Sequence, residues 1–344
     1  MSNEVHHEEY MRRAIELAAL GLGSTSPNPL VGCVIVKEGI IIGEGYHKQY
    51  GQAHAEVNAV RSVGNPENVI GAIAYVTLEP CTFHGKTPPC TDLLIKHQVK
   101  KVVIGALDPH ERVNGVGVER LRSSGIEVET GLLEEQYRHL NRRFFTFYEE
   151  KRPYIILKWA TTSDGFIARK NFDSKWISNA KSRQLVHKWR SEEDAILVGK
   201  NTAKYDNPSL TVREWNGSNP TRILVDLNLE LSPKGNLWDE AAPTLIFNSK
   251  IAKQEGMHEW VQVDAQQYEE ELLAQLHQRK INSLIIEGGS KTLQGFIQKG
   301  LWDEARIFQS EQHFGEGIAA PEISGNLIEE KCVEKDTLKI LHKG

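Results

Sequence analysis

One histidine and two cysteines in the first third of the chain form the sharpest chemical signal. His54-Ala55-Glu56 is followed by Pro80-Cys81, and eight residues separate Cys81 from Cys90. An imidazole and two thiolates are a soft nitrogen and sulfur set that suits zinc. Three protein ligands leave a fourth position open, as in catalytic zinc sites. We therefore expect one catalytic zinc ion per chain, bound by these three side chains.

Glu56 lies two residues from the histidine of this set. Catalytic zinc lowers the pKa of a bound water to about 7, and a neighbouring glutamate can carry protons between that water and a leaving group. The pattern H-x-E with P-C-x-x-C is the signature of zinc-dependent nucleobase deaminases, in which the glutamate is not a ligand. Here eight residues, not two, separate the cysteines, so the match is to a variant of that signature.

These residues have two other possible roles, as core residues or as ligands of a structural zinc. Isolated cysteines and histidines are most often core residues, and a closed structural zinc site needs a fourth ligand. Cys33, the nearest further cysteine, lies in an apolar run and is expected in the core. Cys90 follows the stiff segment Thr87-Pro88-Pro89 and lies near the start of a helix predicted over 92–97, where the helix dipole favours a thiolate. This setting favours a catalytic zinc.

A weaker signal lies at Leu284–Ser290, where an apolar run ends in two glycines before a predicted helix. Backbone N–H groups at a helix start can hold a phosphate, and glycines allow its close approach. The same pattern is commonly only a tight connection, so its spacing leaves both interpretations open. The sole near match to a G-x-G-x-x-G dinucleotide fingerprint, at 315–320, is followed by Pro321, which would break the helix that the fingerprint needs.

The elements that position the first set alternate between helix and strand. Apolar spacing predicts helices at 6–22, 53–63 and 92–97 and one that ends at 125, and strands at 31–36, 40–45, 73–78, 101–106 and 126–130. Glu38-Gly39 is typical of a hairpin turn between the first two strands. This alternation predicts an α/β sheet with helices on both faces.

The 344 residues suggest two domains. Residues 141–153 are rich in charged and aromatic residues and end in Pro153, so we place the domains at 1–147 and 148–344. In the second domain, strands are expected at 154–160, 195–199, 221–225, 244–247 and 283–287, and helices near 180–190, 266–279 and 291–299. A second α/β domain with its own core suggests a second chemical step.

Composition excludes several classes of protein. Lys and Arg number 41 against 46 Asp and Glu, a net charge of −5, which lacks the basic surface of a nucleic-acid-binding protein. The apolar runs are shorter than the roughly 18 residues that span a bilayer, and the first residues lack the apolar core of a secretory signal. Four cysteines argue against a disulfide scaffold. We expect a cytoplasmic enzyme with no nucleic-acid or membrane partner; homo-oligomerisation is left open.

Five segments within residues 25–117 resemble, in order, the deaminase half of the bifunctional riboflavin-biosynthesis deaminase/reductase family: TSPNPLVGCVIV, GEGYH, HAEVNA, YVTLEPCTFHGKTPPC and DPHERVNGVG. The resemblance implies a cytidine-deaminase-like α/β/α fold. It implies the same zinc ligands, His54, Cys81 and Cys90, and Glu56 as the proton carrier. It also implies substrate contacts at Asn28, His84 and Lys86, the last a phosphate partner. Phe83 departs from the family, since many members carry histidine there.

Four later segments resemble the reductase half of the same family: KWATTSDGFIA, DSKWIS, DNPSLTVR and IIEGGSKTLQGF. The resemblance implies a dihydrofolate-reductase-like α/β fold that uses NADPH. Implied cofactor contacts are Ala160, Trp176, Thr202, Asp206, Leu227, Gly289, Ser290, Lys291, Thr292, Leu293, Gln294 and Gly295. Implied substrate contacts are Ser174, Arg190, Leu210, Arg213 and Glu287. The guanidinium groups of Arg190 and Arg213 match a phosphate, although each alone would pass for a surface ion pair. After residue 308 the match is loose.

The resemblance implies two consecutive steps of riboflavin biosynthesis on a small phosphorylated pyrimidine. The first is the zinc-dependent hydrolytic deamination of a phosphoribosylamino-diaminopyrimidinone, and the second is the NADPH-dependent reduction of its ribosyl group to ribityl. NADPH in preference to NADH rests on the resemblance alone. Three alternatives remain at this point: a monofunctional zinc deaminase with an inactive second domain, a nucleic-acid-editing deaminase, and a zinc-stabilised binding protein without turnover.

Overall fold

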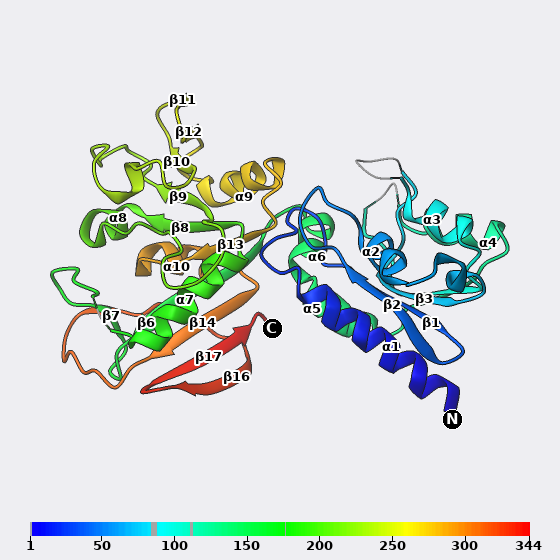
Figure 1. The fold of residues 1–344 in the computed structure, drawn as a ribbon. Coiled ribbons are helices and arrows are strands. Elements are labelled where there is room, and N and C mark those ends of the chain that lie inside the picture. Colours follow the sequence, from blue (N-terminus) through cyan, green and yellow to red (C-terminus); the bar gives the residue numbers. More distant parts are fainter. Residues whose placement is uncertain (1, 84–87, 111–112, 176) are drawn as a thin grey trace. The chain divides into compact units, whose positions relative to one another are not determined.

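Two sheets of different size organise the two halves of the chain. The computed structural model describes residues 2–83, 88–110, 113–175 and 177–344. The chain divides into the units Met1–Glu150 and Lys151–Gly344, with a five-stranded sheet in the first and a ten-stranded sheet in the second (Figure 1). The expected domain boundary at 147/148 lies within α6 (Arg142–Glu149), the last helix of the first unit.

The first sheet has the strand order β2-β1-β3-β4-β5. Its strands are β1 (Gly32–Lys37), β2 (Ile40–Tyr46), β3 (Ile73–Leu78), β4 (Lys101–Ala106) and β5 (Glu127–Thr130). β1 pairs antiparallel with β2 and β3, and β3, β4 and β5 are parallel. Glu38 and Gly39 form the predicted hairpin turn, with φ angles of 53° and 78°, as a two-residue turn that matches strand twist requires.

Helices cover both faces of this sheet because successive strand side chains point to opposite faces (Figure 1). Val34 and Val36 of β1 pack with α1 (Ser2–Ala19), whereas Cys33 and Ile35 pack on the opposite face. That opposite face is covered by α2 (Ala55–Ser62), α3 (Cys90–Lys96) and α4 (Val116–Ser123). α5 (Glu134–Leu140) and α6 contribute aromatic side chains at the ends of β3 and β4. The expected α/β layering and the buried position of Cys33 are confirmed.

The second sheet has the order β11-β12-β10-β9-β8-β13-β6-β14-β17-β16. Its parallel strands are β6 (Tyr154–Thr161), β8 (Ala195–Gly199), β9 (Thr221–Val225), β10 (Thr244–Asn248), β12 (His258–Gln262), β13 (Ser283–Ile286) and β14 (Glu304–Gln309). Antiparallel pairs with β11 (Lys253–Glu255), β17 (Asp336–His342) and β16 (Asn326–Val333) complete its edges. A separate two-stranded pair joins β7 (Phe166–Ala168) to β15 (Ile318–Ala319).

Helices also cover both faces of the second sheet. α9 (Tyr268–Gln278) and α10 (Ser290–Gln298) pack on the face that carries Ile155 and Leu157, and α7 (Ala180–Glu192) packs on the face that carries Ile156. α8 (Lys200–Asp206) follows β8 directly. β13 runs through two glycines into α10, as predicted. Because β6, β8 and β13 are parallel neighbours, the segments that follow them meet at one edge, where α/β sheets bind ligands.

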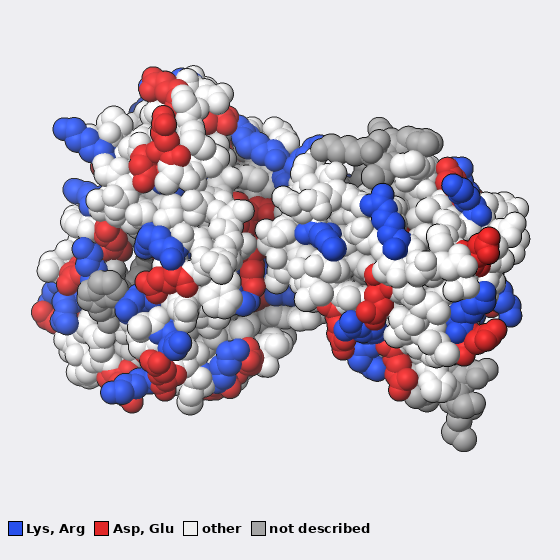
Figure 2. Space-filling view, in the orientation of Figure 1, with Lys and Arg blue, Asp and Glu red and all other residues white. Residues whose placement is uncertain are grey.

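The surface and the helices agree with the composition. On the face shown in Figure 2, basic and acidic side chains are interspersed over both units. Of the helices that the structure describes, none combines the length and the apolar character that crossing a membrane requires.

Candidate active sites

His54, Cys81 and Cys90 come together from three elements of the first unit. His54 precedes α2, Cys81 follows β3, and Cys90 is the first residue of α3. Their ligand atoms all lie within 4.8 Å of one another. Nδ1 of His54 lies 3.6 Å from Sγ of Cys81 and 3.3 Å from Sγ of Cys90. The structure thus brings together the three side chains that the sequence singled out.

Cys81, Cys90 and His54 are hydrogen-bonded to one another through protons whose place a cation could take. A hydrogen bond from Cys90 holds the pKa of the Cys81 thiol well below its ordinary value, and a hydrogen bond to Cys81 raises the pKa of His54. The backbone N–H of Cys90 also donates to Sγ of Cys81, at 3.4 Å. Zinc binding removes protons from such thiols and imidazoles and takes their place. The donor set therefore fits a zinc ion with three protein ligands.

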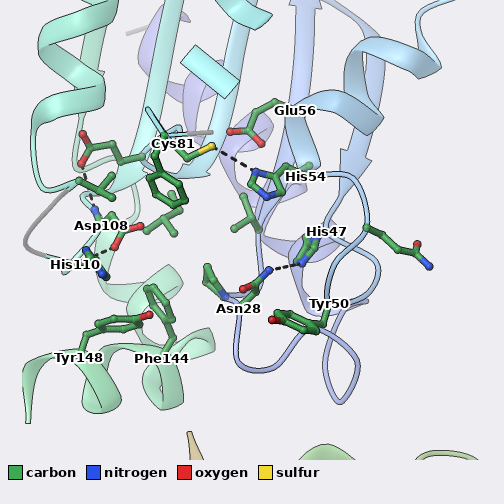
Figure 3. Close-up of a pocket in the computed structure, with 18 of the residues that line it drawn as sticks. Asn28, His47, Tyr50, His54, Glu56, Cys81, Asp108, His110, Phe144 and Tyr148 are labelled. Atoms are coloured by element: carbon green, nitrogen blue, oxygen red, sulfur yellow. Dashed lines mark hydrogen bonds between the residues drawn. The ribbon is translucent and has the colours of Figure 1, made fainter. Parts of the chain in front are cut away.

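Glu56 lies beside this cluster in the first turn of α2. Its side chain is buried, with 3% exposed, and lines the same pocket as His54 and Cys81. Figure 3 shows the Glu56 carboxylate, the Cys81 sulfur and the His54 ring facing one another. Burial raises the pKa of Glu56. A carboxyl group whose pKa is raised toward neutrality can both accept and return a proton.

The pocket has a cavity volume of about 280 Å³ and lies wholly within the first unit. On its wall in Figure 3, Nδ1 of His47 lies 3.1 Å from the Ala53 carbonyl oxygen, and Nε2 lies 3.1 Å from the Asn28 amide nitrogen. Because a carbonyl oxygen only accepts, Nδ1 carries the proton and Nε2 accepts from the amide. Burial lowers the pKa of His47. The Asn28 amide oxygen therefore remains as the acceptor for a ligand.

Asp108 and His47 are pocket residues that we did not predict from the sequence. Asp108 lies two residues beyond β4, and its carboxylate accepts the backbone N–H of His110 at 2.9 Å. Burial raises the pKa of Asp108 to about 6. A signal was present: both residues belong to the quoted segments GEGYH and DPHERVNGVG, and Asp108 lies just past the carboxyl end of a parallel strand.

Two expected substrate residues, His84 and Lys86, lie outside the described residues. Phe83, the residue that departs from the family pattern, lines the pocket and is 56% exposed.

In the second unit, Arg190 of α7 and Glu287 at the end of β13 form a two-point ion pair. Nε and Nη2 of Arg190 lie 3.0 and 2.7 Å from the carboxylate oxygens, and the side chains are 11% and 9% exposed. Burial alone would raise the pKa of Glu287, but the charges of Arg190 and Lys158 outweigh it and lower that pKa to about 2. Two expected substrate residues thus meet here.

Lys158 is a further residue that sequence reasoning missed. It lies on β6, and its charge interacts with both Glu287 and Arg190. Burial lowers the pKa of Lys158. A lysine within the apolar strand YIILKWAT was the available signal, because strands of a parallel sheet are ordinarily apolar throughout.

Arg213 is connected to this ion pair through Thr211, which both arginines contact. Its Nη1 donates to Oγ1 of Thr211 at 3.0 Å, and the Thr211 carbonyl oxygen accepts from Nη1 of Arg190 at 3.3 Å. The backbone N–H of Arg213 donates to Nδ1 of His187 at 3.3 Å. The structure therefore brings both predicted arginines to one place. Leu210 differs, since its side chain is buried in the core and leaves only its main chain for a ligand.

Most of the expected cofactor residues follow β8 and β13: Thr202 and Asp206 lie in α8, and Gly289–Gly295 lie at the start of α10. Ala160 lies on β6 instead, and Leu227 follows β9. Oγ1 of Thr202 in α8 lies 3.2 Å from the position of a Cβ on Gly289, and Oγ1 of Thr292 lies 2.4 Å from that of a Cβ on Gly199. This close approach needs glycine at position 199. Ser174, an expected substrate residue, donates to Asp206 at 2.9 Å. Leu293 is a core residue, and Trp176 lies outside the described residues.

Comparisons with known proteins cover both units. Residues 4–106 match the model of the cytidine and deoxycytidylate deaminase zinc-binding region, and residues 153–340 match that of the RibD C-terminal domain. The riboflavin biosynthesis protein RibD of Aquifex aeolicus is 42% identical over 329 residues, which cover 94% of this chain and 92% of that protein. That of Escherichia coli is 38% identical over 323 residues, 88% of this chain and 86% of that protein.

Two solved structures are similar along the whole chain. A diaminohydroxyphosphoribosylaminopyrimidine deaminase/5-amino-6-(5-phosphoribosylamino)uracil reductase from Thermotoga maritima superimposes with a TM-score of 0.91, at 40% identity and 99% coverage of both chains. Acinetobacter baumannii RibD superimposes with a TM-score of 0.90, at 34% identity, over 99% of this chain and all of that chain.

Proposed function

This chain belongs to the RibD family of bifunctional riboflavin-biosynthesis deaminase/reductases, and we propose which of its residues carry out each of the two steps. Membership confirms the expected pairing of a cytidine-deaminase-like domain with a dihydrofolate-reductase-like domain. The matches over both units decide against a nucleic-acid-editing deaminase, an inactive second domain and a binding protein without turnover. The substrate is the phosphoribosylamino-diaminopyrimidinone, and the product carries a ribityl chain.

In the first unit, His54, Cys81 and Cys90 are the proposed ligands of one zinc ion per chain. The observation that carries this assignment is the meeting of their three donor atoms within 4.8 Å, next to a buried glutamate. A zinc ion held there supplies a Lewis acid that lowers the pKa of water. Glu56 takes the proton of the attacking water and returns it to the amino group that departs as ammonia.

Asn28 and Asp108 of the same pocket are proposed to bind the pyrimidine. Asn28, oriented by His47, accepts a hydrogen bond from a ring N–H or amino group, and Asp108 accepts another from the opposite wall. His84 and Lys86 enter the proposal through the family resemblance only, with Lys86 as a phosphate partner.

In the second unit, NADPH is the proposed hydride donor. Its proposed contacts are Ala160, Trp176, Thr202, Asp206, Leu227 and the segment Gly289–Gly295, and its support is the convergence of α8 and α10 at the carboxyl ends of β8 and β13. Arg213 binds the substrate phosphate through its guanidinium group. Glu287, kept ionised by Arg190 and Lys158, orients the ribosyl group. Ser174 and the main chain of Leu210 are further proposed substrate contacts, through the family resemblance.

The two steps and their order are tested by following NADPH oxidation after only the diaminopyrimidinone ribosyl phosphate is added. We expect the native protein to consume NADPH, and the Glu56→Ala variant to consume it only when the deaminated intermediate is supplied. If the native protein consumed no NADPH with either compound as substrate, the assignment of NADPH to the second unit would be wrong. If Glu56→Ala consumed NADPH with the diaminopyrimidinone ribosyl phosphate as the only added substrate, Glu56 would not be needed for deamination.

Removal of zinc is expected to separate the two activities. Dialysis against a chelator should abolish ammonia release, while reduction of the deaminated intermediate stays within about twofold of its starting rate, because the thiolate ligands belong to the first unit alone. Cys90→Ser should behave in the same way, with zinc content measured by atomic absorption. Cys332→Ser, an exposed cysteine on β16, is the matched control. Full deamination by zinc-free protein would contradict the proposal.

We infer a reducing, cytoplasmic setting from the four free cysteines. The partners proposed are small molecules.

A further inference from the structure

Glu79 is a buried carboxylate that the two proposed reactions leave unused. It directly follows β3, is 3% exposed, and lines the deaminase pocket. Burial of a charged group is costly unless hydrogen bonds compensate it. Here the carboxylate accepts four backbone N–H groups: Oε2 from Asp108 at 3.3 Å and Gly115 at 3.0 Å, and Oε1 from Gly117 at 2.8 Å and Val118 at 3.3 Å.

These four donors lie at the two ends of one segment. Asp108 begins the connection that follows β4, whereas Gly117 and Val118 lie in the first turn of α4. The segment between them supplies Asp108, His110 and Val113 to the pocket wall. One side chain therefore bonds both to Asp108 and to the start of α4, on either side of the wall residues His110 and Val113.

The packing around Gly117 shows how closely α4 approaches Glu79. A Cβ at Gly117 would lie 2.5 Å from the Pro80 carbonyl oxygen and 3.0 Å from Oε1 of Glu79. Only glycine avoids that overlap. The first N–H groups of a helix have no partner within it, and a carboxylate suits both their hydrogen bonds and the positive end of the helix. The contact is therefore specific in its geometry and its charge.

We propose that Glu79 is a positioning residue of the deaminase, which holds Asp108 and the start of α4 in place so that Asp108 and His110 form the substrate-binding wall. Glu79 acts through these contacts and takes no part in proton transfer. The inference rests on the proposed deaminase function for its kinetic consequence, and on the four hydrogen bonds for its structural one. Because the four hydrogen bonds of Glu79 reach Asp108 and the start of α4 and not the zinc donors or Glu56, their loss alters substrate binding more than the chemical step.

The kinetic test uses Glu79→Gln, which replaces one acceptor oxygen by an NH₂ group that faces N–H donors. We expect the KM of deamination to rise about tenfold or more, with kcat within about threefold of the native value. Glu79→Asp, which keeps a carboxylate, should recover part of the KM. Glu119→Gln removes the same charge from the exposed side of the same helix turn and should leave KM unchanged. A fall in kcat at constant KM, or loss of zinc from Glu79→Gln, would overturn the proposal.

A second measurement does not depend on activity. Hydrogen exchange of the Gly115, Gly117 and Val118 amides in the full-length protein should be at least about tenfold faster in Glu79→Gln than in the native chain and in Glu119→Gln. If hydrogen exchange of these amides were unchanged in Glu79→Gln, the proposed positioning role of Glu79 would be overturned even if KM rose. If the native protein did not deaminate the pyrimidine, the proposed function would fail, but hydrogen exchange would still test whether Glu79 holds the start of α4. If Glu79→Gln does not fold, Gly117→Ala, which pushes α4 away from an intact Glu79, should raise both KM and exchange; normal values would overturn the proposal.

Discussion

Replacement of Glu56 by glutamine is expected to lower kcat for deamination by about a thousandfold or more, at the upper end of what a positioned acid–base group contributes. The amide has nearly the same shape but cannot take up a proton from water. Glu56 is buried beside His54 and Cys81 in the pocket. Ammonia release measures the deamination, and NADPH oxidation with the deaminated intermediate should stay at the native rate.

Zinc content decides how the Glu56→Gln result is interpreted. The variant should keep one zinc ion per chain, because the three proposed ligands are untouched. Glu67→Gln, at an exposed position of the short helix at Pro66–Val69, is the matched control and should deaminate normally. Native kcat in Glu56→Gln would refute the proton-carrier assignment, and loss of zinc would show that Glu56 supports metal binding instead.

Replacement of Glu287 by glutamine is expected to lower both the stability of the reductase unit and its rate of reduction. Removing one partner of a buried ion pair costs about 3–5 kcal/mol, because the other charge stays buried without compensation. Here Arg190 and Lys158 would both lose their counter-charge. We expect kcat/KM for reduction to fall about a hundredfold, since a loss of about 3 kcal/mol in the transition state corresponds to that factor. Deamination should not change.

The stability change can be measured in the second unit alone, since all seven tryptophans lie within residues 151–344. Denaturant unfolding followed by tryptophan fluorescence should show the loss at pH 7. The pKa of Glu287 is lowered to about 2 from its ordinary 4.5. A carboxyl group whose pKa is lower in the folded than in the unfolded chain stabilises the fold at every pH above its unfolded pKa. The contribution of Glu287 is therefore lost as pH falls from about 5 toward 2. Glu287→Gln should lack that part of the pH dependence.

The control for Glu287→Gln is Glu192→Gln, which removes an ion pair with Lys188 on the same helix, at a more exposed place. It should leave reduction within about twofold, as expected for a pair near the surface. A Glu287→Gln protein with native stability and native reduction would contradict both the ion-pair argument and the placement of Glu287 in the reductase site.

Some elements of the fold escaped prediction because their patterns depend on distant partners. The aromatic residues of 141–153 marked only a shift in composition, yet Phe144, Phe145 and Phe147 are the buried face of α6. The β16–β17 hairpin was not predicted either. Most of β16 is exposed, and a strand without a buried face lacks the alternation of apolar residues that identifies strands in a sequence.

By itself, the sequence determined the local features of this protein. Runs of apolar and β-branched residues predicted the strands β1, β3 and β4, and Glu38-Gly39 predicted the hairpin. The types and order of the zinc donors and the adjacent Glu56 were also legible, since the chemistry of a soft donor set does not depend on the fold. These features involve neighbours within a few residues, where backbone geometry alone sets which side chains share a face.

Only the tertiary structure decided which distant side chains meet. Arg190 and Glu287 are separated by 97 residues, and His54 and Cys90 by 36, so their contacts depend on strand order and on helix packing. The same holds for His47, which orients Asn28, for Lys158 near Glu287, and for Glu79, which bonds to Asp108 and to the start of α4. Burial creates these partnerships: once water is excluded, each buried polar group must find a partner, and only the packed fold determines which one lies within reach.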